Sequence, residues 1–136
     1  MNTAEALDFL RRHHRCVLAT HRKDSSIQMS PVLAVTDGQD RILVSSREPA
    51  AKVRNLRRDP RATLLVLDKD WFGPWALLEG RAEIVALPEA MDLLVDYYRR
   101  ASGEHSDWDG YRAAMERERR VVVRFAVERA GPTYVG

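Results

Sequence analysis

Six short segments rich in β-branched and aliphatic residues, each bounded by turn-forming residues, constrain the fold of this 136-residue chain most strongly. The segments are residues 16–22, 27–35, 41–46, 61–68, 76–87 and 119–130. Short strands punctuated by Gly, Pro, Asp and Ser are typical of antiparallel sheets. A helical stretch, residues 49–58, separates the third segment from the fourth. The pattern therefore predicts a mainly β fold: a small six-stranded antiparallel β-barrel decorated by helices.

Two residues mark irregularities within the predicted strands. Pro31 cannot donate a ladder hydrogen bond, so it indicates an edge strand, a bulge, or a point where the backbone faces a ligand. Gly80 lies in the middle of the fifth predicted strand and indicates a bulge. In the last strand, alternation predicts that Val123 and Phe125 face one way and Arg124 the other.

Four helices are expected, and each has a recognisable start. Thr3 is a plausible cap for a helix over residues 3–13. Pro49 suits the first position of the helix that runs to residue 58, because its missing N–H would be unpaired there anyway. Pro88 opens the third helix, and Ser106 with Asp109 resembles a capping box for a fourth that ends near residue 115.

Composition sets the broad class of the protein. With 45% hydrophobic and 31% charged residues, the chain is expected to form a single globular domain over residues 1–136. A net charge of +2 is too small for a bulk electrostatic grip on nucleic acid. Cys16 is the only cysteine, which excludes an intrachain disulfide, and its place in an apolar strand predicts a buried, inert thiol.

The sequence shows neither a typical membrane or secretion signal nor the residue spacing of a metal site. No apolar run approaches the roughly 20 residues that span a bilayer. The first 15 residues carry Glu5 and Asp8, which is wrong for a secretory signal, so a cytoplasmic location is expected. Neither the adjacent pair His13 and His14 nor His105 has the spacing of metal ligands, and no metal is expected.

The stretch "VSSREPAAKVRNLRRDPRATLLVLD", residues 44–68, places a basic helix between two apolar strands. A helix N-terminus presents unpaired N–H groups and favours a phosphate. Ser45 and Ser46 can donate hydroxyls just before it, Lys52 lies in its first turns, and Asn55 follows three residues later. Spacing alone leaves two readings open: an anion site, or a solvated surface helix.

The same stretch, with "DSSIQMSPVLAV" before it and "LEGRAEIV" after it, resembles the split-barrel flavin-binding family typified by pyridoxamine 5′-phosphate oxidase. The pattern Lys-x-x-Asn-Leu-x-x-Asp-Pro carries the likeness. The segment "YYRRASGEHSDWDGYRAAMERERRVVV" further resembles the branch of flavin/deazaflavin oxidoreductases called the B type, which uses the deazaflavin coenzyme F-420. The resemblance extends from about residue 7 to residue 130. It implies an FMN-binding type of split β-barrel.

The resemblance also implies a cofactor site. Its cofactor would be coenzyme F-420, with FMN as the alternative, and its activity hydride transfer to a small electron-poor substrate. The positions that match the family's cofactor-binding residues are Gln28, Ser30, Pro31, Val32, Ser45, Ser46, Lys52 and Asn55. Lys52 matches the lysine that contacts the cofactor phosphate. Family members are homodimers with cofactors at the interface, so Trp71 or Trp75 is expected to reach the partner's site.

Several positions depart from the pyridoxamine phosphate oxidase pattern. Ser30 stands where those oxidases carry arginine, Ala51 precedes the lysine where they carry Arg or Ser, and their Arg-Leu-x-Pro-like terminal motif is missing. Oxidation of pyridoxamine phosphate is therefore not expected. Ala50 stands where deazaflavin relatives can place an arginine. The neighbouring arginines at positions 47, 54, 57 and 58 could compensate, or could steer the acidic polyglutamate tail of coenzyme F-420.

The proton donor and the exact role stay open at this level. His21 and Tyr98 are possible donors without a motif behind them. The aromatic loop "DWFGPW" can cover a flat ring or pack in the core. The alternatives to a reductase are a protein that binds a flavin, deazaflavin or tetrapyrrole without turnover, and a nucleic-acid binder, which the balanced charge disfavours.

Overall fold

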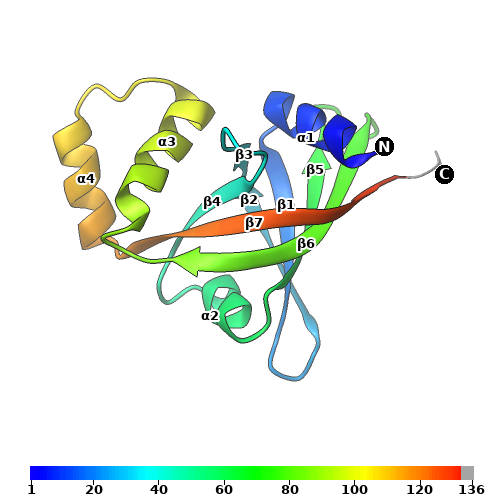
Figure 1. Ribbon diagram of the computed structural model, residues 1–136, viewed down its shortest axis with the longest axis horizontal. Helices are drawn as coiled ribbons and strands as arrows, with labels where there is room; N and C mark the ends of the chain where they lie inside the picture. The colour runs from blue at the N-terminus through cyan, green and yellow to red at the C-terminus, as the bar shows by residue number, and fades with distance from the viewer. Residues whose placement is uncertain (133–136) are drawn as a thin grey trace.

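The structure, a computed structural model, describes residues 1–132 and is dominated by one curled antiparallel sheet (Figure 1). Its strands are β1 (Arg15–His21), β2 (Ile27–Leu33), β3 (Val35–Thr36), β4 (Ile42–Arg47), β5 (Arg61–Leu67), β6 (Trp75–Val85) and β7 (Arg120–Gly131). Its helices are α1 (Thr3–Arg12), α2 (Ala51–Arg58), α3 (Ala90–Ser102) and α4 (Trp108–Arg117). The strand order is β2-β1-β5-β6-β7-β4-β3. The prediction of a mainly β, antiparallel fold with helices is confirmed.

The described chain has seven strands instead of the predicted six, because the segment 27–35 divides at Ala34. The backbone N–H of Ala34 donates to the carbonyl of His14 at 3.0 Å, which takes it out of the ladder. The two products, β2 and β3, lie at opposite edges of the sheet although one residue separates them. The chain itself therefore joins the two edges, and the sheet must curl into a half-barrel.

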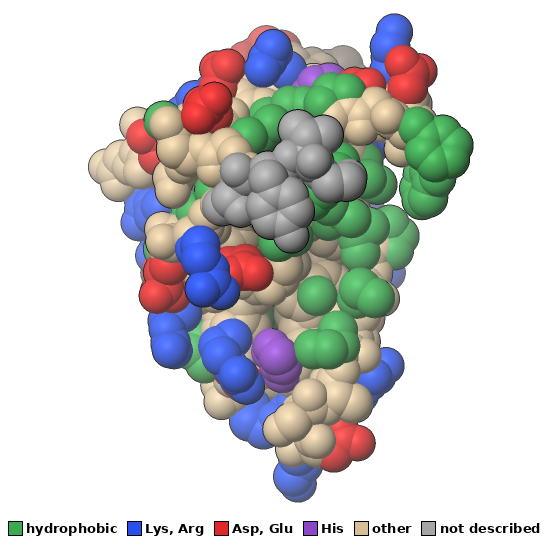
Figure 2. Space-filling view, turned by 90° about the vertical axis from the view of Figure 1, so that its right-hand side faces the viewer, with side chains coloured by type: hydrophobic (Ala, Val, Ile, Leu, Met, Phe, Trp, Pro, Cys, Tyr) green, Lys and Arg blue, Asp and Glu red, His purple; other side chains and the backbone are tan. Residues whose placement is uncertain are grey.

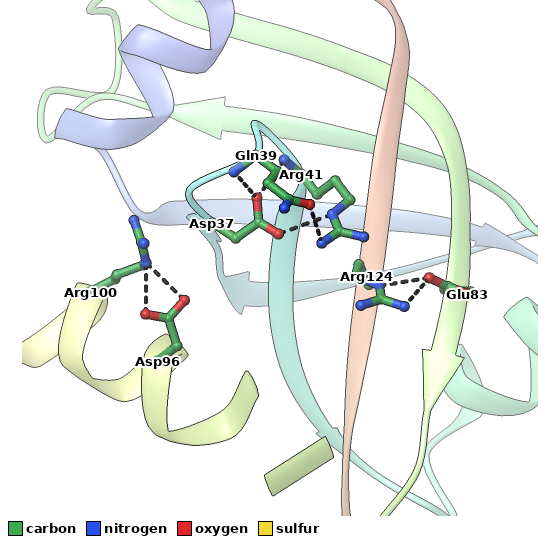
Figure 3. Close-up of polar contacts among 7 residues, drawn as sticks. All are labelled: Asp37, Gln39, Arg41, Glu83, Asp96, Arg100 and Arg124. Carbon is green, nitrogen blue, oxygen red and sulfur yellow. Dashed lines mark hydrogen bonds and ion pairs between the residues drawn. The ribbon is translucent and has the colours of Figure 1, made fainter. Parts of the chain in front are cut away.

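Two apolar clusters lie on opposite faces of β4 and β7. Inside the curl, α1 and Leu56 of α2 pack on the inward side chains, among them Val44 and Val123. On the other face, α3 and α4 cover Leu43 and Val122. The last strand therefore buries both faces near its start, which simple alternation did not predict. Further along, the expected outward residue Arg124 forms an ion pair with Glu83 of β6 (Figure 3).

The turn between β3 and β4 is fixed by one buried carboxylate. Asp37 accepts hydrogen bonds from the backbone N–H groups of Gln39 and Arg41, at 2.8 and 2.9 Å, and from the Arg41 side chain at 3.1 Å (Figure 3). These bonds satisfy the turn's backbone donors and hold the hairpin closed. The hairpin predicted at "TDGQD" is confirmed.

All four predicted helix starts differ from the structure by one or two residues. Asn2 caps α1 in place of Thr3, through a reciprocal capping box with Glu5. Asp107 caps α4 in place of Ser106, since its carboxylate accepts from the backbone N–H of Gly110. The two predicted proline starts are also displaced. Helix α2 begins two residues after Pro49, and α3 begins two residues after Pro88.

Pro49 lies outside α2 for a local reason. The N–H of Ala50 donates to the carbonyl of Arg47 at 3.1 Å, which closes a tight turn around the proline. Ala50 then adopts an extended conformation, with φ −64° and ψ 142°, so the helix can begin only after it. None of the helices in the described part of the chain is long and apolar enough to cross a membrane.

The bulge predicted at Gly80 is confirmed by a register shift between Glu79 and Gly80, where β6 pairs with β7. A side chain at position 80 would overlap the backbone carbonyl of Ala126. We expect Gly80→Ala to lower the free energy of unfolding by about 1–3 kcal/mol, the usual cost of overpacking. Urea unfolding followed by circular dichroism measures this difference.

The matched control is Gly38→Ala, because a Cβ at position 38 would make only an ordinary contact, at 3.7 Å, with the Arg100 side chain. A Gly80→Ala variant as stable as Gly38→Ala would show that β6 and β7 can separate at the bulge without cost.

Candidate functional site

The end of β4 carries the first two candidate residues. Strand alternation points the side chains of Ser45 and Ser46 to opposite faces of the sheet. Ser46 is buried on the face that carries Val44 and the main core, whereas Ser45 is partly exposed on the face that carries Leu43 and α3. The two hydroxyls therefore do not converge as the sequence suggested, and Ser46 is the one on the side of α2.

The first turn of α2 is open to a ligand. Ala50 occupies the N-cap position and no side chain caps the helix. Val53 and Arg54 both donate to the carbonyl of Ala50, at 3.1 and 3.2 Å. The backbone N–H groups of the two preceding residues have no intrahelical partner, as at every helix start. They give this end of α2 a partial positive charge that suits an anion.

Lys52 adds a full positive charge to the same turn. Its side chain is partly buried, and this burial lowers the pKa of the ammonium. No carboxylate within residues 1–132 forms an ion pair with it. A partly desolvated cation without a counter-ion is an unfavourable arrangement in the free protein, and an anionic ligand would relieve it.

The arginines of the same stretch have other partners. Arg47 pairs with Glu118 at 2.8 Å, and Arg57 holds both carboxylate oxygens of Glu48. Arg58 donates to the carbonyl of His21 and to Asn55. These three arginines are therefore already paired within the protein, so a role at the cofactor would require them to share or exchange partners.

Arg54 differs from them. It is exposed and forms no ion pair with the described residues, so it remains the candidate for contact with an acidic tail.

A buried chain of hydrogen bonds links α2 to β2. Asn55, 7% exposed, donates through Nδ2 to the hydroxyl of Thr20 at 3.1 Å, and Thr20 lies next to Gln28 at 3.2 Å. Asn55 and Gln28 were both predicted to belong to the site, and Thr20 connects them. Sequence reasoning missed Thr20, although its inward position after Cys16 and Leu18 in β1 was a readable signal.

Strand β2 divides the remaining candidates between its two faces. Gln28, Ser30 and Val32 point inward, where β2 contacts both α2 and β4. Val32 packs against the main core. Pro31 points outward, so its side chain cannot line the same surface as the other three. Its predicted position in an edge strand is confirmed.

Ser30 supplies the clearest sign of a ligand site on the inward face. Its hydroxyl oxygen is buried and has no hydrogen-bond partner. Buried polar atoms are nearly always paired, so each exception requires an explanation. The inward faces of β2 and β4 with the start of α2 thus bring together Gln28, Ser30, Ser46, Lys52 and Asn55, which can hold a ligand that carries a phosphate and several hydrogen-bond acceptors.

Neither proton donor suggested by the sequence lies in this region. His21 faces outward beside Arg61 and Arg81. Tyr98 belongs to an aromatic cluster with His105, in the loop before α4, and with Trp108 and Tyr111 of α4.

The preceding residue, Tyr97, is the tyrosine near the candidate strands. Its hydroxyl donates to the carbonyl of Leu33 at 2.9 Å. Burial raises the pKa of Tyr97, an effect that the nearby backbone N–H of Ser45 partly offsets. Tyr97 thus spans the gap between β2 and β4.

The outer face of the sheet is unusually apolar. Trp71 and Phe72, in the loop after β5, are 79% and 97% exposed, and Trp75 is 41% exposed. The core-packing alternative for this loop is therefore wrong. The large hydrophobic side chains exposed on β2 are those of Ile27, Met29 and Leu33. Two hollows lie on this face, one of about 330 Å³ beside Trp71 and one of about 360 Å³ beside Pro31. In the space-filling view, hydrophobic side chains gather along the right-hand edge of the molecule (Figure 2).

Metal-ligating residues do not cluster in the part of the chain that the structure covers: no three His, Cys, Asp or Glu side chains there could hold an ion. Cys16 is buried, as predicted, and burial raises the pKa of its thiol to about 12. A thiol of this kind is unreactive at neutral pH.

Comparison with known proteins gives the fold a context. Residues 3–134 match a family model described as pyridoxamine 5′-phosphate oxidase. The conserved hypothetical protein Rv2991 from Mycobacterium tuberculosis is similar over 100% of this chain and 92% of its own, with 27% identity and a TM-score of 0.77. The predicted split-barrel fold is thereby confirmed.

Two further solved structures share the fold at lower identity. An F-420 reductase has a TM-score of 0.70 and 22% identity, over 91% of this chain and 94% of its own. General Stress Protein 26 from Bacillus anthracis has a TM-score of 0.66 and 12% identity, over 94% of this chain and 90% of its own.

Proposed function

Because the chain belongs to the pyridoxamine 5′-phosphate oxidase family, within a superfamily of flavin-binding oxidoreductases, we propose that it is a reductase that uses coenzyme F-420. The reaction would transfer a hydride from the reduced deazaflavin to an electron-poor carbon of a small organic acceptor. Two features favour the deazaflavin: the "GEHSDWDGYR" segment typical of the B type, and the F-420 reductase among proteins of the same fold. FMN is the alternative, although Ser30 stands where the oxidases carry Arg and Ala51 where they carry Arg or Ser, and both changes would weaken a site for the FMN phosphate.

One observation carries the proposal: Lys52 is partly buried beside an uncapped helix start and has no carboxylate partner in the described structure. When bound, the deazaflavin would supply the hydride. The protein would hold its phosphate with Lys52 and the first N–H groups of α2, and its ring with Gln28 and Ser30. These residues fix the position of the ring relative to the substrate, which is the main contribution a protein makes to such a step.

Removal of the Lys52 ammonium tests the phosphate assignment. We expect Lys52→Ala to weaken cofactor binding by about 1.5–3 kcal/mol, since a charge-assisted hydrogen bond is lost. Titration of coenzyme F-420 and of FMN against tryptophan fluorescence measures the affinities. Lys23→Ala, which changes an exposed lysine in the turn after β1, should bind as the wild type does. Equal affinity in the two variants would remove the phosphate from this helix.

The same titration separates the cofactors, because tighter binding of FMN than of coenzyme F-420 would contradict the B-type assignment. Binding without any oxidation of the reduced coenzyme by quinones, activated enones or tetrapyrroles would favour a storage role.

Hydride transfer to a carbon also requires a proton, and we place its donor at Tyr97. The hydroxyl lies 2.9 Å from the carbonyl of Leu33, the last residue of β2, and beside Ser45 on the face of β4 that α3 covers, so it would act from the edge of the candidate site. Its raised pKa keeps the phenol protonated at neutral pH, as a donor must be.

We expect Tyr97→Phe to lower kcat by about 10²–10⁴-fold, the usual contribution of a general acid, with little change in cofactor affinity. Because the pKa of Tyr97 is raised, the wild-type rate should stay constant through neutral pH and fall only at a pH above the ordinary titration range of tyrosine. Stopped-flow oxidation of the reduced coenzyme measures both effects. Tyr98→Phe deletes the same hydroxyl one residue away, in the aromatic cluster. If the two variants react equally fast, Tyr97 is not the donor.

We further propose that the outer face of the sheet pairs with a second copy of this chain. The loop residues Trp71 and Phe72 protrude next to hollows lined by apolar residues of β5 and β2. A protrusion beside a complementary hollow is what a two-fold interface needs, because each copy can then fill the other. Pro31 and Val32 line one of these hollows, so Trp71 or Trp75 of a partner would lie against the outer side of the strand whose inner side carries Gln28 and Ser30.

A charge placed in this face should keep the copies apart. We expect the wild type to be a dimer and Met29→Glu, at a side chain that is 65% exposed, to be a monomer. Sedimentation velocity at micromolar concentration distinguishes the two. The control, Ala113→Glu, changes an exposed residue on α4 and should stay dimeric. A monomeric wild type would contradict the proposal.

A further inference from the structure

In the series of hydrogen bonds that links α2 to β2, Arg58 determines which atom donates and which accepts at each step. Arg58 carries only donors, and its Nη2 lies 3.1 Å from Oδ1 of Asn55. That oxygen is therefore the acceptor, and the amide nitrogen of Asn55 must point the other way. It does so, at 3.1 Å from the hydroxyl of Thr20.

The direction passes on to Gln28. Because the Thr20 oxygen accepts from Asn55, its own proton is free to be donated, and the next polar atom is Oε1 of Gln28 at 3.2 Å. The amide nitrogen of Gln28 then donates one N–H to the carbonyl of Met29, at 3.2 Å. An amide nitrogen carries two N–H groups, so one remains on the partly exposed Gln28.

The hydrogen-bonded series Arg58–Asn55–Thr20–Gln28 is called the relay here. We propose that the relay fixes Gln28 as a hydrogen-bond donor to the edge of the cofactor ring. The inference deepens the proposed function and rests on it. Thr20 and Arg58 are positioning residues: they touch no ligand but decide which end of the Gln28 amide meets it. Without the relay, a glutamine amide can rotate and present either its oxygen or its nitrogen.

The donor has a consequence for the ligand. Ser30, two residues along the same inward face, has a buried hydroxyl without a partner. Gln28 and Ser30 together form a donor pair, and they select a flat ligand whose edge carries hydrogen-bond acceptors. The dione end that flavins and deazaflavins share has this chemistry.

The relay can be tested first in the free protein. The chain contains only two glutamines, Gln28 and Gln39, and two asparagines, so their side-chain amide signals in a ¹⁵N–¹H spectrum are few. We expect the Gln28 amide proton donated to the carbonyl of Met29 to exchange with water more slowly than those of Gln39, and this protection to disappear in Thr20→Val, where the amide is free to rotate. Equal exchange of the two glutamines in the wild type would overturn the relay.

The use of the relay is tested by binding. Thr20→Val keeps the shape of the residue and removes its hydroxyl, whereas Thr20→Ser keeps the hydroxyl. We expect Thr20→Val to bind the phosphate-free deazaflavin chromophore about fivefold to tenfold more weakly than the wild type, as for one lost hydrogen bond, and Thr20→Ser to bind within about twofold. The affinity of both variants for inorganic phosphate should be unchanged, which a general loss of structure would not allow.

A second variant covers the case in which Thr20→Val does not fold. Gln28→Glu, at a partly exposed position, replaces the donor by an acceptor and should weaken binding of the same chromophore more than about tenfold. Wild-type affinity in Gln28→Glu, or equal affinity in the valine and serine variants, would overturn the proposal. If the wild type binds no deazaflavin or flavin at all, the proposed function fails, while the exchange experiment still decides whether the relay exists.

Discussion

The hydrogen bond from Asn55 to Thr20 determines where α2 sits, and the candidate site depends on that position. Thr20 is fully buried and Asn55 almost so, on the inner side of a sheet whose other inward residues are mostly apolar. A buried amide that loses its partner costs about 1–3 kcal/mol, so α2 cannot turn or slide along β1 without that loss. Leu56 and Val53 of the same helix are buried as well and hold it at a fixed depth.

A fixed helix gives the site its charge. Lys52 lies one helical turn before Asn55 on a neighbouring position, so the bond that orients one also orients the other. The acidic residues near α2 pair with arginines and not with Lys52. Glu48 forms an ion pair with Arg57, and this contact lowers the pKa of the Glu48 carboxylate. The positive charge at the helix start is therefore left for a ligand, in a region where the inward hydroxyl of Ser30 is also unpaired.

Local chemistry explains what the sequence could predict. The strands, the bulge at Gly80 and the edge position of Pro31 each follow from what one residue can or cannot do in a ladder. The break at Ala34 could not be predicted, because it depends on the carbonyl of His14, distant in the sequence. Long-range packing also determines part of the site. Whether Tyr97 or Tyr98 faces β2 depends on the rotation of α3 about its axis, and the packing of α3 against α4 and the sheet sets that rotation.

We propose that the start of α2 holds the phosphate of a deazaflavin cofactor. A crystal structure of the complex with coenzyme F-420 tests it most directly. The account predicts a phosphate oxygen about 2.7–2.9 Å from Nζ of Lys52, the length of a charge-assisted hydrogen bond, with further contacts to the first N–H groups of the helix. A phosphate bound at another element, with the Lys52 ammonium in open solvent, would contradict it.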